Sequence, residues 1–141
     1  MSFSVLGELN WLAVIVAAVV YFAVGGLWFM PRVFGNIWMR AIGWEPTEED
    51  RPSAAVYLGP LVTCLVAAIA LGMFAYATGS DTFGEGIVLG LVAGIGVAGA
   101  VLAVTAYFDP KSPKPWTTFG VHAGYHLVGI LVTSVIVSVW T

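Results

Sequence analysis

The stretch GIVLGLVAGIGVAGAVLAVTAYF, residues 86–108, contains no charged side chain and is rich in Val, Ala, Leu and Gly. It is longer than the roughly 20 residues that a helix needs to cross a hydrocarbon core about 30 Å thick. Within lipid every backbone polar group must be hydrogen-bonded inside the protein. A run of this length and composition therefore predicts a transmembrane helix rather than a barrel strand.

Three further uncharged runs, 9–31, 52–80 and 115–141, are long enough to do the same. Of the 141 residues 60% are hydrophobic and 9% are charged, far from the roughly one-quarter charged fraction of a soluble domain. We therefore predict an all-α integral membrane protein that forms a single domain, 1–141. Its four transmembrane helices are expected at about 9–31, 53–79, 84–108 and 116–140.

The N-terminal segment, the cysteine content and the net charge argue against a signal peptide, a disulfide and a nucleic-acid partner. The first ten residues carry Glu8 and no basic side chain, so the first helix is predicted to be retained rather than removed as a signal peptide. Cys64 is the only cysteine, which excludes an intrachain disulfide. A net charge of −3, with five scattered basic residues, predicts no nucleic-acid partner.

The basic residues predict an orientation. They all fall in two connections, the one between the first and second helices and the one between the third and fourth. Basic loops remain in the cytoplasm, so these connections are expected there and both termini outside. The residues concerned are Arg32, Arg40, Arg51, Lys111 and Lys114.

The first connection begins with an amphipathic pattern. Apolar side chains recur at three- and four-residue spacing over 32–44, while Arg32, Asn36 and Arg40 share another face. This pattern predicts a short helix lying in the interface, with Trp38 at headgroup level and the arginines toward anionic lipid. Membrane lipids are thus the first predicted partner.

Prolines and caps predict where several helices begin, end or bend. Pro31 is expected to close the first span, and Gly43 to cap the interfacial helix. Thr47, followed by the acidic residues 48–50, is expected to cap a new helix leading into the second span. Pro60 removes one backbone amide inside that span and is expected to kink it.

Small residues recur at four-residue spacing in the third and fourth spans. Such stripes let helix backbones approach closely in lipid, where no hydrophobic effect drives association. Packing within the four-helix bundle is one use of them. Small residues on several faces of the third span exceed what one neighbour needs, so we also expect self-association into a homo-oligomer. The stripes are Gly86, Gly90, Gly94 and Ala98, and then Gly120 and Gly124.

The fourth span carries two histidines one helical turn apart. They belong to a polar stripe that lipid tails should not contact, formed by Thr118, His122, Tyr125, His126 and Thr133. A helix rises about 1.5 Å per residue, so His126 is expected at the same depth in the membrane as Tyr21 of the first helix and Cys64 of the second. A small polar site is therefore predicted in the cytoplasmic half of the bundle. Its residues are His122, His126, Tyr21, Cys64 and Tyr125, with Tyr57 at its edge and Trp28 as a wall.

Three interpretations of this site stay open. Neutral imidazoles form hydrogen bonds between helices and stabilise a bundle. A titratable pair within a membrane also suits a relay for protons or small solutes. Two histidines at i, i+4 can share a metal or haem, but no intramembrane carboxylate completes a ligand set, so no metal and no cofactor is predicted. The sequence has no Ser-His-Asp arrangement and no carboxylate pair at depth, which predicts that the protein is not an enzyme.

Two stretches resemble a known family. The first is NWLAVIVAAVVYFAVGGLWFMPRVFGNIWMRAIG, residues 10–43, with Asn at the helix start, then Leu-Trp-aromatic-x-Pro and Phe-Gly-x-x-Trp; the second is HAGYHLV, residues 122–128, together with Trp140. They are similar to the small four-helix bacterial membrane proteins known as the domain of unknown function DUF1761. The resemblance implies four helices and a bacterial inner membrane, and it implies no activity. From the residues themselves, the His-lined polar site above all, we expect permeation or transport of protons or a small solute, or alternatively a structural accessory subunit of a membrane complex.

Overall fold

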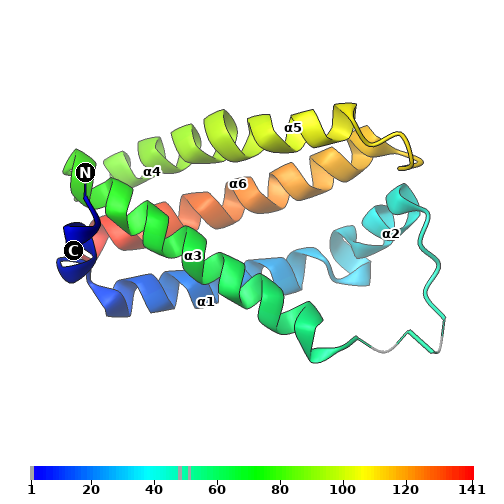
Figure 1. The fold of residues 1–141 in the computed structure, drawn as a ribbon, viewed down its shortest axis with the longest axis horizontal. Coiled ribbons are helices and arrows are strands. Elements are labelled where there is room, and N and C mark those ends of the chain that lie inside the picture. Colours follow the sequence, from blue (N-terminus) through cyan, green and yellow to red (C-terminus); the bar gives the residue numbers. More distant parts are fainter. Residues whose placement is uncertain (1, 48, 51) are drawn as a thin grey trace.

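The protein is described by a computed structural model covering residues 2–47, 49–50 and 52–141 (Figure 1). Expectations for Met1, Glu48 and Arg51 lie outside these residues. Every regular element of the described chain is helical, and four helices are long and apolar enough to span a membrane, as predicted. In chain order the elements are η1 Phe3–Gly7, α1 Trp11–Trp28, η2 Pro31–Gly35, α2 Asn36–Ile42, α3 Ala54–Thr78, α4 Phe83–Leu91, η3 Val92–Gly99, α5 Ala100–Tyr107 and α6 Pro115–Val139.

Pro31 begins an element rather than ending one. α1 stops at Trp28, and the backbone of Met30 is extended (φ −59°, ψ 142°), because a proline disfavours the helical conformation of the residue before it. Pro31 then takes the first position of η2, where a helix has no use for the missing N–H. The short helix predicted between the first two spans is present as η2 and α2, and Gly43 ends it in the left-handed conformation (φ 69°).

The expectation for Thr47 is wrong, because the described residues between Gly43 and Ser53 form no helix. The Asp50 carboxylate folds back instead and accepts hydrogen bonds from the Thr47 amide (2.8 Å) and hydroxyl (3.0 Å). These bonds stabilise the charged form and lower the pKa of Asp50. α3 begins after this turn, at Ala54.

The third span is built from three consecutive helical pieces. Thr82 and Glu85 form a reciprocal capping box at its start, with the Glu85 carboxylate accepting from the Thr82 amide at 3.1 Å. Its middle, η3, is a π-helix with the sequence VAGIGVAG. Glycines make such a widening tolerable because they bring no side chains into the wider turns.

α6 is the helix around which the others pack. It contacts all five of the other described α-helices, whereas the third span contacts little besides α6. Figure 1 shows α6 running between α4 and α5 on one side and α1 on the other, with α3 crossing the bundle. The core lies where α1, α3 and α6 meet, around Val14, Ala17, Tyr21, Ala68 and Leu71.

The two ends of the bundle differ in what they present. The chain termini and the turn from α3 to α4 lie at one end, which we call the terminal end (Figure 1). α2 and the connection from α5 to α6 lie at the other, the α2 end, where the Lys114 amide donates to the Ala41 carbonyl at 3.1 Å. The first turns of α3, residues 54–60, are exposed at this end.

Candidate functional site

The centre of the polar site is a contact between α1 and α6. The Tyr21 hydroxyl oxygen lies 2.6 Å from Nδ1 of His126, and the hydroxyl donates this hydrogen bond when Nδ1 carries no proton. Tyr21 is 3% exposed. Its ring lies directly against Gly129, where any side chain would collide with it. A glycine one turn beyond His126 thus allows α1 to present its hydroxyl to the imidazole.

A second pair of polar groups continues the site into α3. The Tyr125 hydroxyl lies 3.6 Å from Sγ of Cys64, and both residues are buried. The rings of Tyr21 and Tyr125 lie 5.4 Å apart and those of Tyr125 and His126 4.6 Å apart, centroid to centroid. Gly25 leaves room for Tyr125, because a Cβ there would lie 3.0 Å from its hydroxyl. Three helices therefore bring Tyr21, Cys64, Tyr125 and His126 together.

His122 lies one turn of α6 nearer the α2 end, among aromatic rings. Its ring centroid is 5.5 Å from that of Phe29 and 6.3 Å from that of Trp38 in α2. Trp28, expected as a wall of the site, lies against Gly124 of α6 and donates from Nε1 to the Val121 carbonyl (3.0 Å). No hydrogen bond to the His122 ring is found among the described residues.

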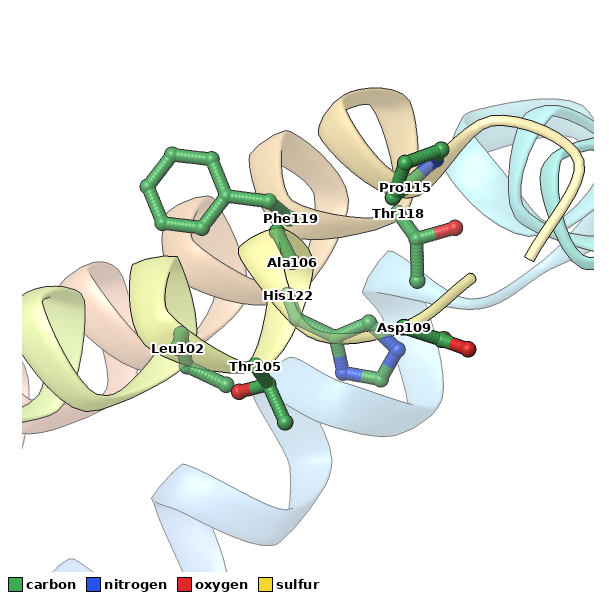
Figure 2. A pocket seen from close by; sticks show the side chains of 8 residues that line it. All are labelled: Leu102, Thr105, Ala106, Asp109, Pro115, Thr118, Phe119 and His122. Atoms are coloured by element: carbon green, nitrogen blue, oxygen red, sulfur yellow. The ribbon is translucent and has the colours of Figure 1, made fainter. Parts of the chain in front are cut away.

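His122 also lines a cavity of about 200 Å³ between α5 and α6. Figure 2 shows its imidazole turned toward the side that carries Thr105 and Asp109, while the ring of Phe119 points away. The imidazole is thus connected to a hollow with a carboxylate at its edge. The other lining residues are Leu102, Ala106, Pro115, Phe119 and Thr118, a member of the predicted polar stripe.

Tyr57 lies away from the site. Its side chain is 56% exposed because the first turns of α3 lie outside the packed bundle. Thr133 is fully buried two turns of α6 beyond His126. Its hydroxyl and those of Ser134 and Ser138 have no hydrogen-bond partner within the described part of the chain.

The glycine stripe of the third span faces α6. A Cβ built at Gly86 would lie 2.8 Å from Cα of Val135, and one at Gly90 would lie 2.8 Å from Cα of Leu131. Gly94 meets Leu127 in the same way at 2.9 Å. Ala98, the last member of the stripe, is partly buried against the core.

The two glycines of α6 differ from each other. A Cβ at Gly124 would lie 2.8 Å from the Trp28 ring, so α1 approaches closely there. A Cβ added at Gly120 would have no described atom within 4 Å apart from its own turn of helix, so the close packing expected at this position does not occur inside the described chain.

Several residues of the site region were not anticipated from the sequence. Asp109 and Thr105 were missed because they fall at the end of a span, where periodicity does not show which way a side chain points. Ser134 and Ser138 were missed because they lie on the α6 face toward Gly86 rather than on the histidine face. Gly129 lies next to Tyr125 and His126 on the helix surface, and a glycine at that position could have indicated that a large side chain from another helix packs there.

The described residues contain no group of three or more His, Cys, Asp and Glu side chains arranged to hold a metal ion. Fold and site together define a small helical membrane protein with four spans and a His-Tyr cluster inside the bundle. The chain belongs to the family described as "Protein of unknown function (DUF1761)", which matches residues 12–138. No curated protein and no solved structure matches the chain.

Proposed function

We propose that the protein is a proton or small-solute permeation protein of the bacterial inner membrane, with the His-Tyr cluster as its relay. The observation that carries the proposal is the 2.6 Å contact between Tyr21 and His126. It places a hydroxyl, which both donates and accepts, against an imidazole, which accepts on one nitrogen and donates from the other. Such pairs pass protons without moving heavy atoms far.

The cavity between α5 and α6 supplies an entrance to this relay. Asp109 stands at its edge and His122 at its inner side, one helical turn from His126. A proton collected by the carboxylate would pass to His122, then to His126 and Tyr21. Titratable groups at membrane depth often mark such pathways.

Beyond His126, α6 carries buried hydroxyls on two faces: Thr133 on the histidine face, and Ser134 and Ser138 on the face toward α4. Thr133, Ser134 and Ser138 are each fully buried. A buried hydroxyl without a partner costs roughly 1–3 kcal/mol, so water passing these positions would be stabilised. Thr133 therefore supports a route toward the terminal end, whereas Ser134 and Ser138 face α4 and are not part of it.

The proposed setting follows from charge and shape. Arg32 and Arg40 on the interfacial helix, with Lys111 and Lys114, suit a cytoplasmic surface in contact with anionic lipid, which leaves both termini outside. We propose no enzymatic activity and no cofactor.

Homo-oligomer formation is part of the proposal. Gly96 has no described atom within 4 Å of an added Cβ, and Ala100, one turn away, is exposed. This small-residue pair suits close approach by a second copy. Gly96→Leu should therefore lower the particle mass in detergent, measured by light scattering, while thermal stability of the monomer is kept. Unchanged mass would remove this part of the proposal.

The alternative is a structural accessory subunit, and the same outward face of the third span favours it. In that case the Tyr21–His126 hydrogen bond would serve only to hold α1 against α6. Glutamine at position 126 would then be tolerated, because it keeps hydrogen-bonding capacity.

Proteoliposomes separate the two functions. Protons are driven by a potassium diffusion potential and followed with an entrapped pH dye. We expect flux from the wild-type protein, loss of flux in His126→Gln and Tyr21→Phe, and normal flux in Tyr57→Phe, which alters a tyrosine outside the site. Flux no greater than in empty liposomes, or equal in all four proteins, would refute the relay.

A further inference from the structure

A second cavity lies at the terminal end of the bundle, between the start of α1, the end of α3 and the end of α6. Its volume is about 270 Å³. We propose that it binds a small organic ammonium group, either on a free amine or on an ethanolamine headgroup. The proposal does not depend on the relay through the histidines.

The lining of this cavity has the chemistry that ammonium groups require. Glu8 provides a carboxylate, and Tyr76 and Trp140 provide aromatic rings. Carboxylates form strong charge-assisted hydrogen bonds with ammonium groups, and ring faces attract cations electrostatically. Val14, Gly72 and Val137 add an apolar floor that suits the carbon substituents of an amine.

These polar groups are uncommitted within the described chain. The Glu8 carboxylate, the Tyr76 hydroxyl and the Trp140 indole make no hydrogen bond to any described residue. By contrast, the Asn10 side-chain oxygen in the same lining already accepts from the Ala13 amide at 3.2 Å. The carboxylate is thus available to a ligand without breaking a bond of the fold.

The charge distribution favours a cation over an anion. The charged side chains described at the terminal end are Glu8, Asp81 and Glu85, all acidic. The described basic residues lie at the α2 end, roughly 36 Å away along α6 at 1.5 Å per residue. That separation exceeds the Debye length of about 8 Å at physiological salt, so the basic residues do not offset the acidic field.

Calorimetric titration with ethanolamine hydrochloride tests the site on the full chain in detergent, with sodium chloride as the ionic-strength control. We expect saturable binding by the wild type. Glu8→Gln, which keeps shape and removes charge, should bind roughly tenfold more weakly, and Trp140→Leu roughly threefold more weakly. Asp81→Asn removes a carboxylate of the same end outside the cavity and should bind normally. No saturable heat, or equal affinity in Glu8→Gln and wild type, would overturn the site.

Nanodiscs distinguish the two sources of the ammonium group. In phosphatidylglycerol nanodiscs, after subtraction of empty discs, ethanolamine should bind as in detergent. If added phosphatidylethanolamine weakens this binding, a lipid headgroup occupies the cavity; if it has no effect, the ligand is a free amine. His126→Gln should bind ethanolamine normally, so a failed relay and a failed ammonium site give different results.

Discussion

Gly129 is the residue on which the polar site depends most directly. The Tyr21 ring lies on its backbone, and the tyrosine reaches His126 because no side chain stands between them. A larger residue would push α1 and α6 apart, and the cost would appear both as strain and as a lost hydrogen bond.

Gly129→Ala should therefore destabilise the protein by roughly 1–3 kcal/mol and lower its melting temperature in detergent. Gly120→Ala is the matched control, since it lies in the same helix with no described atom within 4 Å of an added Cβ. That variant should be unchanged or slightly more stable, because alanine favours a helix over glycine. Equal melting temperatures for the two variants would contradict the close contact.

A double-mutant cycle measures the hydrogen bond itself. Tyr21→Phe removes the hydroxyl, His126→Leu removes the imidazole, and the double variant removes both. We expect a coupling energy of about 1 kcal/mol from thermal unfolding in detergent, typical of polar pairs between membrane helices. Additive effects of the two substitutions would show that the side chains do not interact.

Depth along the helices allowed much of the site to be predicted from sequence. Counting residues placed Tyr21, Cys64 and His126 at one level, and the structure brings all three into one cluster. Counting did not reveal the pairing, in which Tyr125 rather than a histidine reaches Cys64. It also did not reveal Asp109, because its position depends on the path of a connection and not on helical periodicity.

At the scale of elements, the glycines of the third span let its backbone pack closely against the backbone of α6. Gly86, Gly90 and Gly94 each face an α6 residue at a distance that leaves no room for a side chain. α6 also carries the two histidines, so the packing of the third span on another face of α6 helps to hold the histidines in place.

Gly90→Leu should disrupt this contact, because its side chain would enter the α6 backbone at Leu131. We expect a loss of several kcal/mol, of the order seen for severe overpacking, and poor recovery of folded protein. Val88→Leu serves as the control, since Val88 is 60% exposed and the change adds little volume. Folded yield and thermal unfolding measure both, and equal stability would mean that the stripe is not packed.

The ends of elements were harder to predict than their number. Long uncharged runs predicted all four spans because a single apolar run of this length satisfies its backbone hydrogen bonds in lipid by forming a helix. Pro31 was expected to close a helix and instead opens the next one, since both uses satisfy its missing N–H. Thr47 was expected to cap a helix, but no described helix follows it before Ala54, and its amide and hydroxyl both donate to the Asp50 carboxylate in a local turn.

For the whole molecule, the separation of charge predicts how the bundle lies in the membrane. The described basic residues are at the α2 end, and the terminal end carries only acidic charge among its described residues. The proposed orientation, the cytoplasmic entrance and the outer ammonium site all depend on this asymmetry.

Cysteine labelling in intact cells tests the orientation. In a Cys64→Ala background, Asp81→Cys should react with a membrane-impermeant maleimide, and Lys111→Cys should react only after the cells are opened. The reverse pattern would show that the chain is inserted the other way, and equal labelling of both would indicate dual topology.

The central place of α6 also has a consequence for biogenesis. α6 is the last of the four spans to leave the ribosome, yet the other described α-helices all contact it. Until it enters the bilayer, the glycine face of α4 and the hydroxyl of Tyr21 lack their partners on this chain. We therefore expect the three earlier spans to be incompletely packed until α6 inserts, although α1 and α3 also contact each other. A nascent chain stalled before Pro115 should accordingly be a substrate for membrane proteases.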